Sequence, residues 1–206
     1  MSEPKQTAKR VALAVLASGR SQRFGAEDKL IASLGGRPLA AFAADQLSGV
    51  ELAGKFAIVG RGSKDVAALF AASNWSIIDN AHPERGQGRS VALAAAAARA
   101  TSCDALLITL ADMPLVTNAH LHAIISAGLG RDGVMTQSEG RLLPPALFAR
   151  TAFDTLCDLD GDRGARRLFD TLPNTARVEA SAELVLDVDT PRDLDFLNRA
   201  LGRNID

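Results

Sequence analysis

The chain has 206 residues, of which 47% are hydrophobic, and this length suits one sizeable buried core. Its 23 basic and 24 acidic side chains leave a formal net charge of -1 without long runs of either sign, which argues against nucleic acid or an anionic membrane as a partner. Cys103 and Cys157 stand far apart and show no zinc spacing with the three histidines, so neither a disulfide scaffold nor a zinc site is expected.

Apolar runs of strand length alternate with helix-forming segments through the first half of the chain. Residues 1–10 are polar and are expected to form a disordered tail, and no later apolar run is long enough to cross a bilayer, so we expect a cytoplasmic protein. The predicted strands are Val11–Leu16, Phe56–Val59, Trp75–Ile78 and Ala105–Leu110. The predicted helices are Pro38–Leu47, Asp65–Ala72 and the Ala-rich Val91–Ala100.

The second half of the chain is less regular until its last segment. A helix capped by Thr117 and a short strand over Val134–Thr136 precede a region rich in Pro and Arg. Glu183–Asp189 predicts another strand, and Thr190–Pro191 predicts the start of a closing helix. No repeat or linker marks a second domain. Residues 11–202 are therefore expected to form one Rossmann-like α/β domain, doubly wound, with a mostly parallel sheet and helices on both faces.

The connection after the first strand, Leu16–Leu30, combines small and basic residues in the sequence LASGRSQRFGAEDKL. In an open parallel sheet it lies at the carboxyl edge, where ligands bind. Backbone N–H groups of small residues can turn toward a phosphate chain, while Arg23 and Lys29 can neutralise charge on the α-phosphate and the leaving pyrophosphate. Neither GxxxxGK[ST] nor GxGxxG occurs, which excludes a Walker loop and a dinucleotide fingerprint. Taken alone, such a segment is more often an ordinary surface loop.

A second loop precedes the Ala-rich helix. Gly86–Gly88 form a turn that exposes backbone amides at a helix N-terminus, an arrangement that favours a base edge or an anion. The alternative is that the glycines merely permit the turn and that Ser90 caps the helix.

Three carboxylates are candidates for a metal site. Asp112 follows a buried strand at the carboxyl edge, and a magnesium ion would need a further acid beside it. Asp187 and Asp189 alternate along the last predicted strand and so point to the same side, where they could bind one ion together with Asp112. The alternative is a helix start formed by Thr190 and Asp193, which leaves Asp187 unexplained.

Several motifs occur in the order found in one enzyme family. LASGRSQRFGAEDKL followed by LGGRPL resembles the signature of the MobA-like nucleotidyltransferase superfamily, LAAGxSxRxG with KL and GxPL, although Ser18 stands where that family usually has Ala. The chain resembles its molybdenum-cofactor cytidylyltransferase, or MocA-like, group from Val11 to Leu197 through GQGRS, LADMP, GDRGAR and LDVDTPRDL. Leu143 departs from the group, which has a Gly there. The resemblance implies a fold of the nucleotide-diphospho-sugar transferase type.

The resemblance also assigns roles to individual residues. Catalysis would depend on Arg23, Lys29 and Asp112, and Asp112, Asp187 and Asp189 would bind Mg²⁺. Nucleotide binding would involve Leu16, Ala17, Ser18, Gly19, Arg20, Ser21, Arg23, Lys29, Asp79, Gly86, Gln87, Gly88 and Ser90. Acceptor binding would involve Pro145, Asp162, Arg163, Gly164 and Arg166.

The implied reaction is transfer of CMP from CTP to a phosphorylated acceptor, molybdenum-bound molybdopterin, with release of pyrophosphate and without a covalent enzyme intermediate. A molybdoenzyme or its maturation factor is an implied protein partner. One alternative is guanylyl or cytidylyl transfer to a sugar phosphate, methylerythritol phosphate or phospholactate, which Leu143 keeps open. Another is a non-catalytic cofactor-delivery protein, against which the presence of both Lys29 and Asp112 argues.

Overall fold

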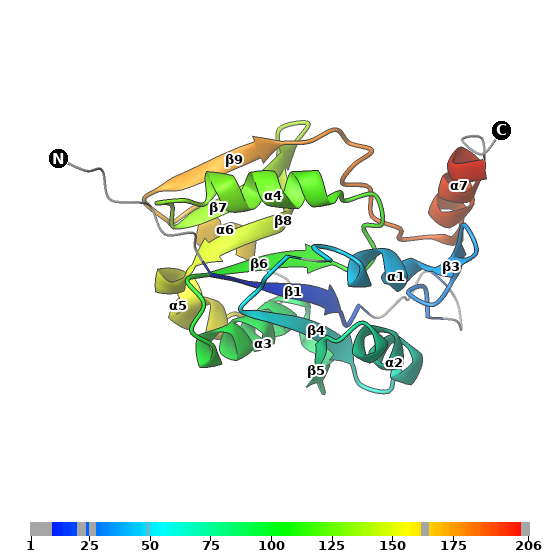
Figure 1. The fold of residues 1–206 in the computed structure, drawn as a ribbon, viewed down its shortest axis with the longest axis horizontal. Helices are drawn as coiled ribbons and strands as arrows, with labels where there is room; N and C mark the ends of the chain where they lie inside the picture. Colours follow the sequence, from blue (N-terminus) through cyan, green and yellow to red (C-terminus); the bar gives the residue numbers. More distant parts are fainter. Residues whose placement is uncertain (1–9, 20–23, 25–27, 49, 162–164, 203–206) are drawn as a thin grey trace.

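A seven-stranded sheet runs through the molecule, with helices on both of its faces (Figure 1). The computed structural model describes residues 10–19, 24, 28–48, 50–161 and 165–202. Neighbouring strands pair in parallel, except that β8 runs antiparallel to both of its neighbours. In spatial order the strands are β5 (Ser76–Asn80), β4 (Gly54–Gly60), β1 (Val11–Ala17), β6 (Ala105–Leu110), β8 (Arg141–Ala149), β7 (Gly133–Ser138) and β9 (Thr175–Glu179). The predicted doubly wound, mostly parallel α/β sheet is confirmed.

The strands β1, β4, β5 and β6 are the apolar runs that the sequence predicts. β1 is buried along its whole length and pairs with β4 on one side and β6 on the other. A strand that is covered on both faces reads as a continuous apolar run. The four predicted strands agree with the observed ones to within two residues at each end, including the edge strand β5, which is largely exposed.

Two apolar clusters fill the space between the sheet and its helices. Successive residues of β1 point to opposite faces, so that Leu13 and Val15 join one cluster while Ala12 and Ala14 join the other. The first cluster packs against α1 (Leu39–Ala44), α2 (Lys64–Ala72), α4 (Asn118–Ala127) and α7 (Pro191–Gly202). The second packs against α3 (Gln87–Ala100), α5 (Phe153–Cys157) and α6 (Ala165–Phe169).

The predicted helices agree with the observed ones in place and type. The Thr117 side chain accepts a hydrogen bond from the backbone N–H of His120, which confirms Thr117 as the cap of α4. The closing helix α7 begins at Pro191 as predicted and lies at one end of the molecule, beside the small ribbon of β2 (Ser33–Leu34) and β3 (Arg37–Pro38) (Figure 1). Two short 3-10 turns, η1 (Pro83–Arg85) and η2 (Arg150–Ala152), complete the described elements. No helix within the described ranges is both long and apolar enough to cross a membrane.

The second half of the sheet differs from the sequence prediction. β7 continues into β8 through a turn at Glu139–Gly140, where both residues have positive φ. The sequence predicts no regular element over β8. The register between β7 and β8 shifts after Met135, so that Pro144 and Pro145 are accommodated in a bulge. β9 was not predicted. Glu183–Asp189, in contrast, is no strand but the end of a turn followed by a segment without regular secondary structure.

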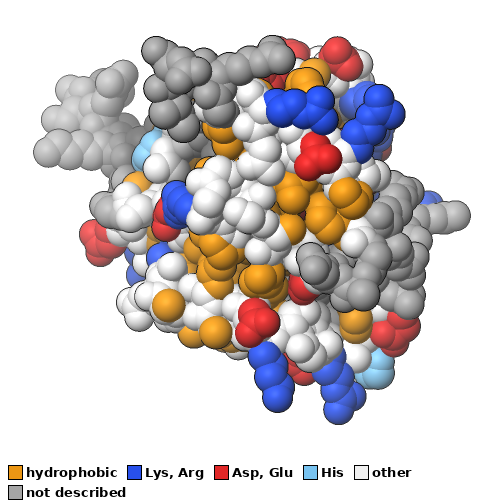
Figure 2. All heavy atoms as spheres, turned by 90° about the vertical axis from the view of Figure 1, so that its right-hand side faces the viewer, with side chains coloured by type: hydrophobic (Ala, Val, Ile, Leu, Met, Phe, Trp, Pro, Cys, Tyr) orange, Lys and Arg blue, Asp and Glu red, His pale blue; other side chains and the backbone are white. Residues whose placement is uncertain are grey.

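The strand order reverses between β1 and β6, and a reversal of this kind predicts a ligand crevice at the carboxyl edge of the sheet. The chain leaves β1 toward β4 and β5 on one side, then crosses by α3 to β6 on the other. Loops that diverge from two adjacent strands leave room for a ligand between them. Figure 2 views this edge, where hydrophobic side chains gather near the centre of the face and charged side chains surround them.

Candidate active site

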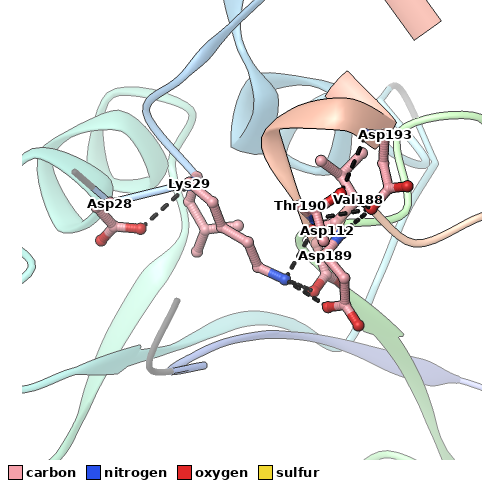
Figure 3. Close-up of polar contacts among 8 residues, drawn as sticks. Asp28, Lys29, Asp112, Val188, Asp189, Thr190 and Asp193 are labelled. Atoms are coloured by element: carbon pink, nitrogen blue, oxygen red, sulfur yellow. Dashed lines mark hydrogen bonds and ion pairs between the residues drawn. The ribbon is translucent and has the colours of Figure 1, made fainter. Parts of the chain in front are cut away.

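Lys29 is the centre of a buried charged cluster in the crevice. Its side chain reaches from the connection after β1 toward the end of β6, and only 6% of the residue is exposed. Lys29 Nζ donates to Asp112 Oδ2 at 2.7 Å, to the Val188 carbonyl at 2.9 Å and to Asp189 Oδ1 at 3.2 Å (Figure 3). The structure therefore brings together three of the residues that the sequence assigned to catalysis or metal binding.

Backbone contacts hold the two carboxylates in place. The N–H of Val188 donates to the Asp112 carbonyl at 2.9 Å, which ties the segment before α7 to the end of β6. Asp193 Oδ2 accepts from the Thr190 N–H at 2.7 Å and from the Asp189 N–H at 3.1 Å, while Thr190 Oγ1 accepts from the Asp193 N–H. These reciprocal bonds form a capping box at the start of α7. Thr190 and Asp193 thus start the helix, and Asp187 and Asp189 are left beside Asp112.

The cluster combines one cation, Lys29, with the carboxylates of Asp112, Asp187 and Asp189. Burial lowers the pKa of the Lys29 ammonium, but the charges and hydrogen bonds of Asp112 and Asp189 outweigh it, so that the pKa lies above its ordinary value. Limited solvent access, followed by the negative charges of Asp189 and Asp112, raises the pKa of Asp187. The cluster therefore carries more negative charge than Lys29 neutralises.

A hard divalent cation fits this donor set. Asp112 Oδ1 is buried and has no hydrogen-bond partner, so one carboxylate oxygen is available for a further cation. Within the described ranges, no group of three or more His, Cys, Asp or Glu side chains is arranged as a complete metal site. Magnesium commonly uses one or two protein carboxylates and completes its shell with substrate phosphates and water. The assignment of Asp112, Asp187 and Asp189 as ligands stays a prediction.

A second polar cluster lies on the opposite side of the β1 carboxyl end. Ser18 Oγ lies 2.6 Å from Ser90 Oγ, and Asn80 Nδ2 donates to Ser90 Oγ at 3.1 Å and to Ser18 Oγ at 3.4 Å. All three residues are buried. Since α3 begins at Gln87 with Gly86 as its cap residue, Ser90 lies in the first helical turn, and the alternative of Ser90 as cap is wrong.

Gly88 lets the 160–161 turn approach the start of α3. The Gly88 N–H donates to the Gly161 carbonyl at 2.8 Å, and a Cβ at position 88 would lie only 2.7 Å from that oxygen. Arg85 forms an ion pair with Asp160 at 2.7 Å in the same place. The hydrogen bond from Arg85 is the main reason that the pKa of Asp160 is lowered. Gly161, the first residue of the GDRGAR motif, therefore lies beside the GQGRS motif.

The remaining predicted site residues fall into two groups. Arg20, Ser21, Arg23, Asp162, Arg163 and Gly164 lie outside the described residues. Among the described ones, Leu16 and Ala17 are buried at the end of β1, Gly19 follows them, and Gln87 is exposed at the start of α3. Asp79 and Arg166 are exposed, and Pro145 is buried with its carbonyl bonded to Thr136 Oγ1 at 2.9 Å. Their roles stay predictions.

The sequence was compared with protein families and with known proteins. The family model of the MobA-like NTP transferase domain matches residues 13–180. The chain belongs to this family. The purine catabolism protein PucB of Bacillus subtilis (strain 168) is 31% identical over 199 residues, which cover 91% of this chain and 95% of PucB. This MobA-like chain is therefore a member of a nucleotidyltransferase family.

Solved structures share the MobA-like fold. A homologue of Mycobacterium tuberculosis Rv0371c from Mycobacterium sp. strain JC1 is 24% identical and has a TM-score of 0.79, with 95% of this chain and 98% of that chain covered. Rv0371c of M. tuberculosis H37Rv in complex with manganese is 22% identical and has a TM-score of 0.76, with 93% of this chain and 99% of that chain covered. Both likenesses concern the fold.

The sequence missed two contributions to the site of this MobA-like chain. Asn80 joins Ser18 and Ser90, whereas the predicted residue was its neighbour Asp79. Adjacent strand residues point to opposite faces, so the period-2 pattern of the strand was the signal that separates them. The Val188 carbonyl accepts a hydrogen bond from Lys29, and no side-chain pattern could have indicated that contact.

Proposed function

We propose that this MobA-like chain is a magnesium-dependent cytidylyltransferase that transfers CMP from CTP to a phosphorylated acceptor, molybdenum-bound molybdopterin, and releases pyrophosphate. The observation that carries the proposal is the cluster of Lys29, Asp112 and Asp189 at the sheet reversal. It holds a buried cation and several carboxylates beside the loop in which the sequence predicts phosphate binding. A nucleotide loop and a carboxylate cluster in one crevice are what nucleotidyl transfer requires.

The proposed reaction is a direct displacement. An oxygen of the acceptor phosphate forms a bond to the α-phosphorus of CTP, and the bond from that phosphorus to the bridging oxygen breaks, with pyrophosphate taking the electron pair. The acceptor phosphate is already ionised, so no general base is needed. Lys29 would neutralise charge on the transferring phosphate, as would Arg23 of the same connection, and such preorganised charge is commonly the largest catalytic contribution.

Asp112, with Asp187 or Asp189, would hold the magnesium ion. The unpartnered Asp112 Oδ1 and the surplus of carboxylates support this assignment. When bound, such an ion supplies a Lewis acid that orients the triphosphate and offsets its developing charge. Rv0371c, which shares the fold, has been crystallised in complex with manganese, and this supports a divalent cation in the proposed reaction.

The cytidine base would bind at the start of α3. The cluster of Ser18, Asn80 and Ser90 fixes the first turn of that helix against the β1 loop. The amides of Gly86 and Gly88 are already bonded to the Pro83 and Gly161 carbonyls, so the attraction for an anion or a base edge would come from the positive end of the α3 dipole. A different acceptor, such as a sugar phosphate, is the second candidate, because Leu143 replaces the Gly of the MocA-like group.

The test is pyrophosphate release from CTP, GTP or ATP, each with Mg²⁺ and purified molybdopterin-type acceptor. We expect release with CTP and loss of about 10²-fold or more in the Asp112→Asn variant, with an unchanged circular dichroism spectrum. Asp154→Asn is the matched control, since Asp154 is exposed on α5, away from the crevice. Full activity of Asp112→Asn would refute the metal assignment, and release with GTP alone would refute the base preference.

A further inference from the structure

Asn198, on the closing helix α7, binds the β2–β3 ribbon through both atoms of its side-chain amide. Its Oδ1 accepts a hydrogen bond from the Gly35 N–H at 2.8 Å, and its Nδ2 donates to the Ser33 carbonyl at 3.1 Å. Gly35 has a positive φ of 57° at the turn between the two strands, and the ribbon lies beside α7 (Figure 1). A single side chain therefore fixes the end of the ribbon to the helix.

The chain between Lys29 and this ribbon is short and tightly turned. The Ala32 N–H donates to the Lys29 carbonyl at 3.2 Å, directly before β2 begins. Leu30 and Leu34 are buried in the apolar cluster that also contains Leu197 of α7. A displacement of the ribbon along α7 would therefore displace the backbone of Lys29 as well.

The segment that carries Lys29 is attached to the α7 region at a second place. Lys29 Nζ donates to the Val188 carbonyl and to Asp189 Oδ1, just before α7 begins at Pro191. Asn198 lies roughly two turns after Pro191, about 10 Å along the helix axis. Two attachments at this spacing resist rotation of the segment as well as sliding. The flexible Lys29 side chain alone would resist neither, because its four-carbon stem can follow a moving backbone.

We propose that Asn198 is a positioning residue, whose amide fixes the β2–β3 ribbon against α7 and thereby holds the Lys29 ammonium between Asp112 and Asp189. Among the described residues, Asn198 forms no hydrogen bond to this carboxylate cluster, so its effect on catalysis passes through Lys29. The catalytic part of the inference rests on the proposed function, in which Lys29 neutralises charge on the transferring phosphate. A displacement of about 1 Å in such a group can cost about 10²-fold in rate.

The experiment is a double-mutant cycle of Asn198→Ala and Lys29→Met in the full chain, with Tm and the kcat of pyrophosphate release from CTP as readouts. We expect each single change to lower the Tm by about 2–6 °C, and the double variant to lose less than the sum, since only independent sites add. Asn198→Ala should lower kcat about tenfold with little change in the KM for CTP. In the Lys29→Met background it should lower kcat no further.

Asn174→Ala is the matched control. Asn174 is exposed and likewise joins two partners, because its Oδ1 accepts from the Arg131 side chain and its Nδ2 donates to the Gly130 carbonyl. It directly precedes β9, at the amino edge of the parallel strands. Its Tm loss should add to that of Lys29→Met, and its kcat should equal that of the wild type.

Asn198→Asp is a second variant that creates no cavity. It keeps an acceptor for the Gly35 N–H but places a carboxylate oxygen against the Ser33 carbonyl, so it should reproduce the effects of Asn198→Ala. Kinetics like those of the wild type in both Asn198 variants would overturn the proposal.

Tm losses that add fully for Asn198→Ala and Lys29→Met would also overturn it, as would an equal fall in kcat with and without Lys29, although the transferase function would stand. Tm losses that add incompletely, in a protein that releases pyrophosphate from no triphosphate, would support the link between Asn198 and Lys29 and refute the transferase.

Discussion

Lys29 Nζ lies 2.7 Å from Asp112 Oδ2, although the two residues are 83 positions apart and follow different strands, β1 and β6. The Lys29 ammonium lies between the Asp112 and Asp189 carboxylates, which are also candidate metal ligands. Lys29 therefore neutralises part of the negative charge of these carboxylates. Binding of a triphosphate with its cation would exchange one set of ionic partners for another.

Replacing Lys29 with Met should lower the stability of the protein and strengthen its response to a divalent cation. Without the ammonium, Asp112 and Asp189 lose their shared hydrogen-bond donor, so the free energy of unfolding should fall by about 1–3 kcal/mol in metal-free buffer. Millimolar Mn²⁺ should then raise the Tm of the variant more than that of the wild type, because the cation no longer competes with Lys29. Calorimetric scans with and without Mn²⁺ measure both effects. Lys64→Met, at an exposed position, is the control, and equal Mn²⁺ shifts in all proteins would contradict the expectation.

Asn80 should matter more than Ser18 for the nucleotide side of the site. Asn80→Ala removes both bonds to the serines and the acceptor for the His82 N–H, so a loss of about 1–3 kcal/mol is expected. Ser18→Ala leaves the bond between Asn80 and Ser90 in place and should cost about 0.5–1.5 kcal/mol. Urea denaturation gives the order of stabilities, and the KM for the triphosphate should rise in the same order. The reverse order would show that Ser18 holds the cluster.

Gly88→Ala tests the contact between α3 and the 160–161 turn. In an ordinary helix this change stabilises by about 0.5–1 kcal/mol. Here the new Cβ would lie 2.7 Å from the Gly161 carbonyl oxygen and 2.9 Å from the Asp160 carbonyl carbon, and both atoms are backbone. We therefore expect destabilisation of about 1–3 kcal/mol, measured by urea unfolding. The sign alone decides, because a stabilised variant would mean that the turn does not press against the helix.

His120 should make stability fall in mildly acidic solution. Burial lowers the pKa of its imidazole below the ordinary 6.5, so the unfolded chain binds a proton at a higher pH than the folded one does. Stability is therefore lost as the pH falls from about 6.5 through the lower pKa of the folded state. His120→Gln can keep the hydrogen bond to Thr136 Oγ1 and should remove this pH dependence. Urea unfolding at several pH values measures it, with His122→Gln on the exposed face of α4 as control. An equally steep fall in His120→Gln would assign the effect to other groups.

The parallel half of the fold could be predicted because burial on both faces leaves a strong pattern. β8 was not predicted, because Pro144 and Pro145 are unfavourable in a regular strand. Only the bulge in the three-dimensional structure makes room for them. The predicted strand over Glu183–Asp189 was wrong for the opposite reason, because its pattern is strand-like but it pairs with no neighbouring strand. Its apolar residues, such as Val185 and Val188, fill the core, but the Val188 N–H bonds to the Asp112 carbonyl and not to a neighbouring strand.

Site residues could be predicted where a charged side chain follows a buried strand or a Gly-rich loop. Asp112 follows an apolar strand at the carboxyl edge, and Lys29 follows a Gly-rich loop, so both patterns indicated the crevice. The direct contact between the two depends on loop conformation, which no periodicity encodes. The same limit applies to Asn198, since its bonds to Ser33 and Gly35 can be recognised only when the structure is known.

The sheet divides the molecule into two apolar clusters, and the start of α3 and a cavity lined by Met113, Leu143 and Val185 are on different sides of it. Substitutions that share no packing neighbours usually contribute independently to free energy. Natural variation could therefore reshape the cavity while leaving the start of α3 intact. For a protein engineer, the same separation means that two libraries, one for each side, can be selected apart and then combined.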